Sequence, residues 1–148
     1  MRRAEGRDLD ALIGLENSAF AADRISARSW KHLVASPSAV VAIAEAEGSV
    51  HGAIVLLYRA TSSVARIYSI AVAPGSRGQG IAGRLMAFAI ERSHNDGAAV
   101  LHLETRLDNI KAQSLFERFG FSRFGRHARY YADGVDALRY RKNLFKGN

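Results

Sequence analysis

The chain has 148 residues, which is the length of one domain, and we expect a single domain over residues 1–148. Hydrophobic residues make up 48% of it and cysteine is absent, which permits a core but excludes disulfides, thiolate metal ligands and an acyl-cysteine intermediate. The formal charge is +7. No run approaches the roughly 18 apolar residues of a membrane span, and the N-terminus lacks a signal peptide's apolar stretch. We therefore expect a soluble cytoplasmic protein, and we expect no metal.

A short strand and two helices are predicted first. The strand begins at Arg3 and Ala4. Asp8 is the expected cap of the first helix, whose apolar residues recur at a roughly helical spacing: Leu9, Leu12, Ile13, Leu15 and Phe20. Ser26 or Ser29 is expected to cap the second helix, which carries Trp30, Leu33 and Val34.

The middle of the chain has the composition of strands. Residues 39–46 and 50–58 are rich in Val and Ile on either side of Gly48-Ser49, which predicts an antiparallel hairpin. Residues 64–72 are expected to form a third strand. After a glycine-rich turn, residues 81–93 have the apolar periodicity of a helix.

The last part is predicted to contain a buried strand over 99–105 and a helix that Asp108 or Asn109 caps and Gly120 ends. Two final strands are expected around Asp133-Gly134, which resembles the tight turn of a hairpin. The order β-α-α-β-β-β-α-β-α-β-β joins an antiparallel meander to a central β-α-β crossover. It predicts an α/β fold with a mixed, mostly antiparallel sheet flanked by helices.

The glycine-rich turn between residues 64–72 and 81–93 is the most informative segment. Gly78, Gly80 and Gly83 let the backbone approach a ligand closely, and the first turn of the following helix offers unpaired N–H groups. Together with the helix dipole, these groups predict a cradle for a pyrophosphate.

A dinucleotide-binding pattern is the competing interpretation of this turn. Residues 78–83 match G-x-G-x-x-G, and Glu104 lies at the distance of a ribose-binding acid. That fold needs successive parallel strand–helix units, whereas here the turn follows an antiparallel meander. The Walker pattern fails as well, because no Gly-Lys-Ser/Thr is present.

The same turn resembles the acetyl-CoA signature of the GNAT N-acetyltransferase superfamily, Arg/Gln-x-x-Gly-x-Gly/Ala, in the form Arg77-Gly78-Gln79-Gly80-Ile81-Ala82. The family's second feature, Asn…Leu-Tyr-x-x-x-Gly-Phe, resembles Asn109 followed by residues 115–121, Leu-Phe-Glu-Arg-Phe-Gly-Phe. The resemblance covers nearly the whole chain. It implies a GNAT-type domain that transfers an acetyl group from acetyl-CoA to an amine.

The resemblance also implies where acetyl-CoA binds. The acetyl and pantetheine arm would contact the backbone of Ile70, Ala71 and Val72, where an N–H group could stabilise the oxyanion. The pyrophosphate would lie on the turn, which comprises Arg77, Gly78, Gln79, Gly80, Ile81, Ala82 and Gly83. Asn109 would bind the pantetheine side. Phe116 stands where the family has a tyrosine that protonates the leaving thiolate, and phenylalanine cannot donate a proton.

Glu104 is the candidate base, because direct transfer needs a neutral amine. Residues 103–106, Leu-Glu-Thr-Arg, resemble the Leu-Glu-Val-Arg of bacterial ribosomal-protein alanine acetyltransferases, in which the glutamate is the base. The alternative is a carboxylate paired with Arg106 or another arginine. Tyr130 or Tyr131 would replace the missing acid, unless these tyrosines bind substrate or pack the hairpin.

The acceptor is predicted from the C-terminal part. Residues 129–138 resemble the same ribosomal-protein group and favour a protein or peptide N-terminus, such as that of a ribosomal protein. A small amine acceptor, and a CoA-binding regulator without turnover, stay open as alternatives. Residues 118–148 contain eight basic and two acidic residues, which form either a solvated surface or a site for an anionic partner. The absence of an interleaved aromatic motif argues against nucleic acid as the main ligand.

Overall fold

The computed structural model describes residues 1–145, in which seven strands form one sheet in the order β1-β2-β3-β4-β5-β7-β6. The β4–β5 pair is parallel and the other neighbours are antiparallel. The strands are β1 Arg2–Arg3, β2 Ala39–Ala46, β3 Ser49–Leu57, β4 Val64–Val72, β5 Val100–Arg106, β6 Ser122–His127 and β7 Ala137–Asn143.

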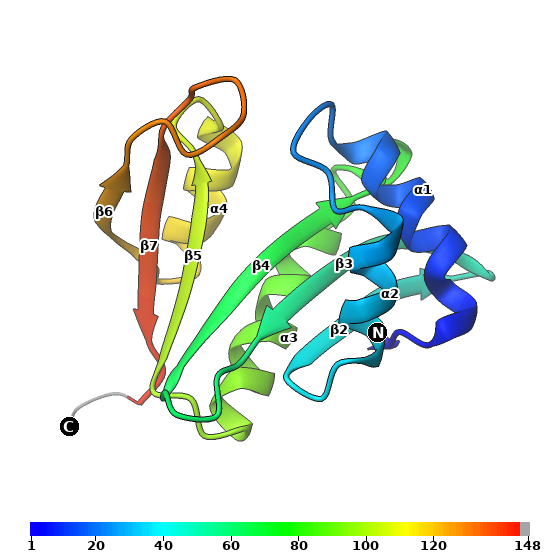
Figure 1. Cartoon of the computed structure of the whole chain (residues 1–148), viewed down its shortest axis with the longest axis horizontal. Coiled ribbons are helices and arrows are strands. Elements are labelled where there is room, and N and C mark those ends of the chain that lie inside the picture. The colour runs from blue at the N-terminus through cyan, green and yellow to red at the C-terminus, as the bar shows by residue number, and fades with distance from the viewer. Residues whose placement is uncertain (146–148) are drawn as a thin grey trace.

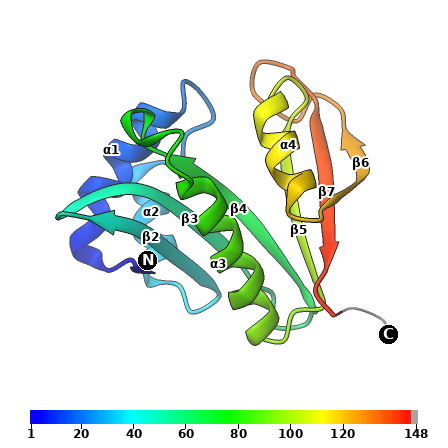
Figure 2. The ribbon, with the colours of Figure 1, turned by 180° about the vertical axis from the view of Figure 1, so that it is seen from behind.

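Helices lie on both faces of the sheet (Figures 1 and 2). They are α1 Leu9–Ala19, α2 Ala27–Ala35, α3 Ile81–Asn95 and α4 Ile110–Arg118. On one face α1 and α2 cover β2, β3 and β4, and on the other face α3 and α4 follow the two halves of the sheet. The predicted order of elements is confirmed, including the β4-α3-β5 crossover.

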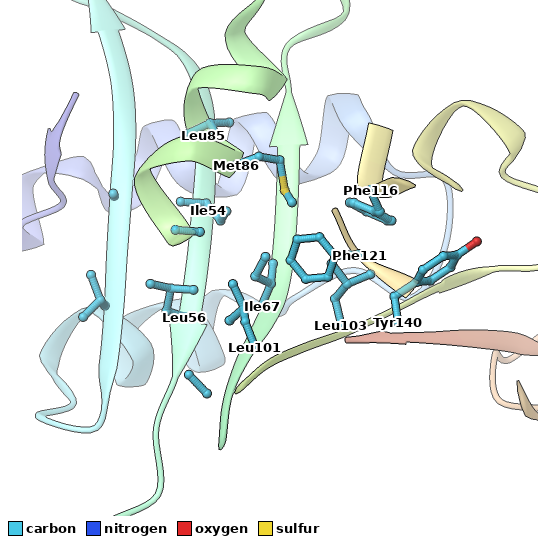
Figure 3. Close-up of a cluster of buried hydrophobic side chains, with 14 of the residues drawn as sticks. Ile54, Leu56, Ile67, Leu85, Met86, Leu101, Leu103, Phe116, Phe121 and Tyr140 are labelled. Atoms are coloured by element: carbon cyan, nitrogen blue, oxygen red, sulfur yellow. The ribbon is translucent and has the colours of Figure 1, made fainter. Parts of the chain in front are cut away.

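Each face of the sheet has its own core. On the α3 and α4 side, Leu85, Met86 and Phe116 pack with strand residues that include Ile67 and Leu103 (Figure 3). On the α1 and α2 side, a second core buries Leu12, Leu15, Trp30, Val41, Ile43 and Val55. Because alternate residues of β2 and β3 face the two cores, residues 39–44 of β2 and 53–57 of β3 are continuously apolar.

The helix boundaries follow local chemistry. Ser26 caps α2, because its hydroxyl accepts a hydrogen bond of 3.1 Å from the Ser29 N–H. Asn109 caps α4 in the same way, with the Ala112 N–H at 3.1 Å. Gly120, at φ +86°, ends α4 as predicted. Asp8 precedes α1, but its carboxylate accepts from the Glu5 N–H at 2.7 Å and so closes the 3₁₀ turn before α1.

The prediction of a tight turn at Asp133-Gly134 is wrong. Strand β6 ends at His127 and β7 begins at Ala137, so both residues lie in a longer loop. The Asp136 carboxylate holds this loop, accepting from the Arg129 N–H at 2.9 Å and from Arg126 at 2.5 Å. Side-chain hydrogen bonds therefore replace the two-residue turn that the dipeptide suggested.

Three strands each carry one unpaired extra residue, a β-bulge. In β3 the pairing with β2 passes from Gly52 to Val50 and skips His51. In β4 the pairing with β3 skips Tyr68, and in β6 the pairing with β7 skips Phe124. A bulge bends its strand and re-aims its side chains.

Strands β4 and β5 diverge along their length (Figure 1). Their pairing runs only from Val64 opposite Val100 to Ile67 opposite Leu103, although β4 continues to Val72 and β5 to Arg106. The edge of β4 that faces β5 therefore has no strand partner beyond Ile67, and its backbone groups are available to a ligand.

Candidate active site

The glycine-rich turn has the backbone of an anion cradle. Gly78 and Gly80 have φ angles of +81° and +76°, in the left-handed region that favours glycine. A Cβ at either position would meet no other atom within 4 Å, so this face of the turn is open. The helix α3 begins directly after Gly80, and its first N–H groups have no partner within the helix. A pyrophosphate fits such a site.

The turn is anchored to the neighbouring strand. The His51 ring nitrogen Nδ1 lies 2.6 Å from the hydroxyl of Ser76, a buried residue at the start of the turn. The Ala73 N–H also donates to the His51 carbonyl at 2.8 Å. The bulged residue of β3 therefore fixes the position at which the chain leaves β4 for α3.

The other predicted cofactor residues fall into three places. Ile70, Ala71 and Val72 pair with β3, and their other edge lies on the stretch of β4 that β5 does not pair, next to the turn. Arg77 and Gln79 are exposed, whereas Ile81 is buried beneath the turn. Gly83 lies in the first turn of α3, facing the Phe119 ring, where a Cβ would make an ordinary contact at 3.6 Å. The positions suit the expected arm and pyrophosphate of acetyl-CoA, and the individual contacts stay predictions.

Asn109 and Phe116 have structural roles in the chain itself. The side-chain oxygen of Asn109 caps α4, which leaves its amide nitrogen for the predicted pantetheine contact. Phe116 is 3% exposed and packs against Phe121 and Tyr140, with ring centroids 6.3 and 6.0 Å away. It therefore belongs to the core between α4 and the sheet (Figure 3).

Glu104 lies where β5 has separated from β4, and its side chain is 13% exposed. The Arg66 guanidinium forms an ion pair with it, and the Tyr130 hydroxyl donates to the same carboxylate oxygen at 3.2 Å. Arg66 also donates to the Tyr130 oxygen at 3.0 Å. The Arg139 Nε is 3.9 Å from the second carboxylate oxygen. The structure thus brings the predicted base and one predicted tyrosine into a single hydrogen-bonded cluster.

Arg66 is the site residue that sequence reasoning missed. Arg106, the partner considered for Glu104, instead pairs with Asp108 at 3.0 Å and Asp133 at 2.7 Å. Burial alone would lower the pKa of Arg66, but Glu104 and Tyr130 raise it on balance, so its charge is retained. The available signal was a charged residue, Arg66, within a mostly apolar strand over 64–72.

Tyr131 lies beside the cluster. Its ring centroid is 5.1 Å from that of Tyr130, and the Arg106 guanidinium lies 5.1 Å above it. Burial, with further contributions from Tyr130 and Glu104, raises the pKa of Tyr131 to about 12. Its phenol therefore keeps its proton at neutral pH, as a proton donor must.

The fold and this site together have the arrangement of an acyltransferase-type domain: a glycine-rich turn before a helix, an open strand edge, and a carboxylate where two strands separate. Residues 9–121 match the Acetyltransferase (GNAT) family, and the chain belongs to this family. In residues 1–145 no helix is long and apolar enough to cross a membrane, and no three His, Asp or Glu side chains gather to hold a metal ion.

Two relatives and one solved structure illustrate the similarity. The chain is 42% identical over 84 residues to N-alpha-acetyltransferase 30 of Schizosaccharomyces pombe, which covers 57% of this chain and 56% of that protein. It is 30% identical over 139 residues to a Bacillus subtilis protein named as a ribosomal protein bS18-alanine N-acetyltransferase, covering 93% and 91%. The crystal structure of the ribosomal-protein-S18-alanine N-acetyltransferase from Escherichia coli shares the fold, with a TM-score of 0.88, 24% identity and coverage of 99% and 94%.

Proposed function

We propose that the chain is an N-terminal acetyltransferase, which transfers the acetyl group of acetyl-CoA directly to the α-amine of a protein or peptide. The observation that carries the proposal is Glu104, held by Arg66 and Tyr130 where β5 leaves β4. The names of the relatives support the acceptor class, since one name specifies an α-amine and the other the alanine of ribosomal protein bS18. A cytoplasmic location stays a prediction.

Acetyl-CoA, when bound, supplies the acetyl group as an activated thioester. The chain's own residues would position it: the turn at Gly78 to Gly83 would hold the pyrophosphate, and the unpaired edge of β4 would bind the arm. Both lie next to the β4–β5 divergence, so the reactive end would be directed toward Glu104.

Glu104 would accept a proton from the acceptor's ammonium group, directly or through a water. An α-amine has a pKa of about 8, so much of the acceptor is protonated at neutral pH and a base assists the reaction. Arg66 and Tyr130 would orient the carboxylate, and the protonated phenol of Tyr131 or the hydroxyl of Tyr130 could supply a proton to the leaving group.

A thiol-release assay tests the proposal. The protein is mixed with acetyl-CoA and, in separate reactions, with a ribosomal-type Ala-first peptide, a Met-first peptide and small amines. We expect CoA release with at least one peptide. CoA release with small amines alone would show that the acceptor is a small molecule. Tight acetyl-CoA binding without CoA release would favour a CoA-binding regulator without turnover.

The variant Glu104→Gln tests the base. We expect transfer to slow by about 100-fold, with the largest loss at low pH, where the amine holds its proton. Glu91→Gln is the matched control, because Glu91 is an exposed residue of α3. An unchanged rate across the pH range would remove Glu104 as the base.

A further inference from the structure

No helix of the described chain covers one face of the C-terminal half of the sheet. In Figure 1 this face of β5, β7 and β6 is seen from the front, with α4 behind it. Its side chains follow from the strand register, in which Glu104 lies opposite Arg139 and His102 opposite Arg141. The face is therefore lined by charged side chains and is continuous with the candidate active site.

Phe124, the bulged residue of β6, organises this face. The guanidinium carbons of Arg139 and Arg141 lie 4.8 and 5.3 Å from its ring centroid, and the His102 ring lies 4.8 Å away. Gly125, the next residue of β6, lies opposite Arg139 in the β6–β7 register. An arginine stacked on an aromatic ring keeps its N–H donors free at the edge of its plane.

Positive charge is in excess here. Glu104 is shared by Arg66 and Arg139, and no carboxylate of the described residues pairs with Arg141, which is exposed. Burial, together with Arg139 and Arg141, lowers the pKa of His102, so this ring adds no charge at neutral pH. The stacked Arg141 thus presents pre-oriented donors without a carboxylate acceptor among the described residues, and Arg139 has only its 3.9 Å contact with Glu104, which together suit a further carboxylate.

We propose that the surface formed by Phe124, Arg139 and Arg141 binds acidic side chains of the acceptor polypeptide, a few residues after the amine that is acetylated. The proposal rests on the proposed function and adds a preference for acidic acceptors. Arg139 links the two sites, because it contacts Phe124 and also approaches Glu104.

The geometry sets which acceptor residues reach the surface. Residues two apart on a strand are roughly 7 Å apart along it, and an extended peptide advances about 3.3 Å per residue. Arg139 lies directly opposite Glu104, and Arg141 is two residues further along β7. An amine at Glu104 therefore places roughly the third acceptor residue over Arg141, within reach of acidic side chains at the third and fourth positions. RNA fits less well, because His102 and the two arginines already occupy the surroundings of the Phe124 ring on which a base would stack.

Three peptides that share their first two residues test the preference. They carry Asp, Asn or Lys at positions 3 and 4, and kcat/KM is measured with the full-length protein at low and high salt. We expect kcat/KM to be about threefold to tenfold higher for the Asp peptide than for the Asn peptide, mainly through KM, and to be lowest for the Lys peptide. The difference should shrink at high salt.

Variants assign the effect to the surface. In Arg141→Gln the ratio of kcat/KM between the Asp and Asn peptides should fall toward one. Arg123→Gln is the matched control. Arg123 is also exposed, but in the strand register it lies opposite Tyr140, whose side chain is in the core, so Arg123 is on the other face of the sheet. That variant should keep the wild-type ratio.

Direct binding separates this proposal from the proposed function. Fluorescence anisotropy with labelled Asp and Asn peptides measures the preference even if no peptide is acetylated. Equal affinities would overturn the acidic surface while leaving peptide acetylation intact, whereas absent CoA release with preferential Asp binding would overturn only the enzyme assignment. Salt-sensitive binding of a labelled oligoribonucleotide that Arg141→Gln abolishes, together with no peptide preference, would assign the surface to nucleic acid instead.

Discussion

The carboxylate of Asp23 accepts a hydrogen bond of 3.2 Å from the backbone N–H of Ala132, residues that are 109 positions apart in the chain. The bond joins the loop between α1 and α2 to the loop between β6 and β7. Because Tyr130 and Tyr131 stand in the second loop, it connects the positions of both tyrosines to the helical layer on the other half of the sheet.

Breaking this bond should weaken acceptor binding. Asp23→Gly removes the acceptor without straining the backbone, because Asp23 has a φ of 56°, which glycine adopts freely. We expect KM for the peptide to rise by roughly fivefold, with a smaller change in kcat, since one such bond contributes about 1 kcal/mol. Steady-state kinetics compare it with Asp23→Asn, which keeps an acceptor oxygen. Equal KM values in the two variants would show that this hydrogen bond does not contribute to acceptor binding.

Tyr130 should matter more than Tyr131 for the rate. Tyr130→Phe loses the hydroxyl that contacts both Glu104 and Arg66, and we expect kcat/KM to fall by about tenfold. Tyr131→Phe preserves that cluster and serves as the comparison. The rates of both variants are measured from pH 6 to pH 10. A larger loss of activity in Tyr131→Phe than in Tyr130→Phe would assign the proton-donor role to Tyr131.

Gly80→Glu should abolish acetyl-CoA binding, because the substitution puts a carboxylate and a strained φ of +76° into the cradle. Gly97→Glu is the control, since Gly97 also has a positive φ, +89°, but follows the opposite end of α3. Calorimetric titration with acetyl-CoA should show binding only in the control. Wild-type affinity in Gly80→Glu would refute the cradle.

Asp8 should make stability depend on pH in the acidic range. The hydrogen bond from Arg2 lowers the pKa of Asp8 to about 2, below the value of about 3.9 in an unfolded chain. The stabilisation is thus complete above about pH 4 and is lost as the pH falls toward 2. We expect Asp8→Asn to lower the free energy of unfolding by about 1 kcal/mol at pH 7 in urea titrations, and by less near pH 2. A pH-independent difference would exclude the ionised carboxylate as its source.

The element order was predictable from the sequence because each segment has a clear local signal. Residues 39–44 and 53–57 are continuously apolar, and Ser26 and Asn109 stand directly before apolar helical periods. The loop after β6 was not predictable, because Asp136 holds it through partners that a dipeptide pattern does not reveal.

For the candidate site, the cradle and Glu104 followed from motifs that are contiguous in sequence. Arg66 did not, because its partner lies 38 residues away and the two meet only through the parallel register of β4 and β5. The same holds for the stacking of Arg139 and Arg141 on Phe124, which depends on a bulge that no local pattern marks.

The three bulges have a shared consequence. His51 contacts the start of the cradle, Tyr68 lies 5.5 Å from the Arg66 guanidinium, and Phe124 carries two arginines. Each of these residues is the bulged residue of its strand, which has no partner in the pairing with the neighbouring strand. Deleting any one would give a regular strand, and the residues on one side of the deletion would then exchange faces, so that in β4 Arg66 would point toward the core. Single-residue bulges thus place polar and aromatic side chains at the candidate sites while the apolar residues of the same strands stay in the two cores.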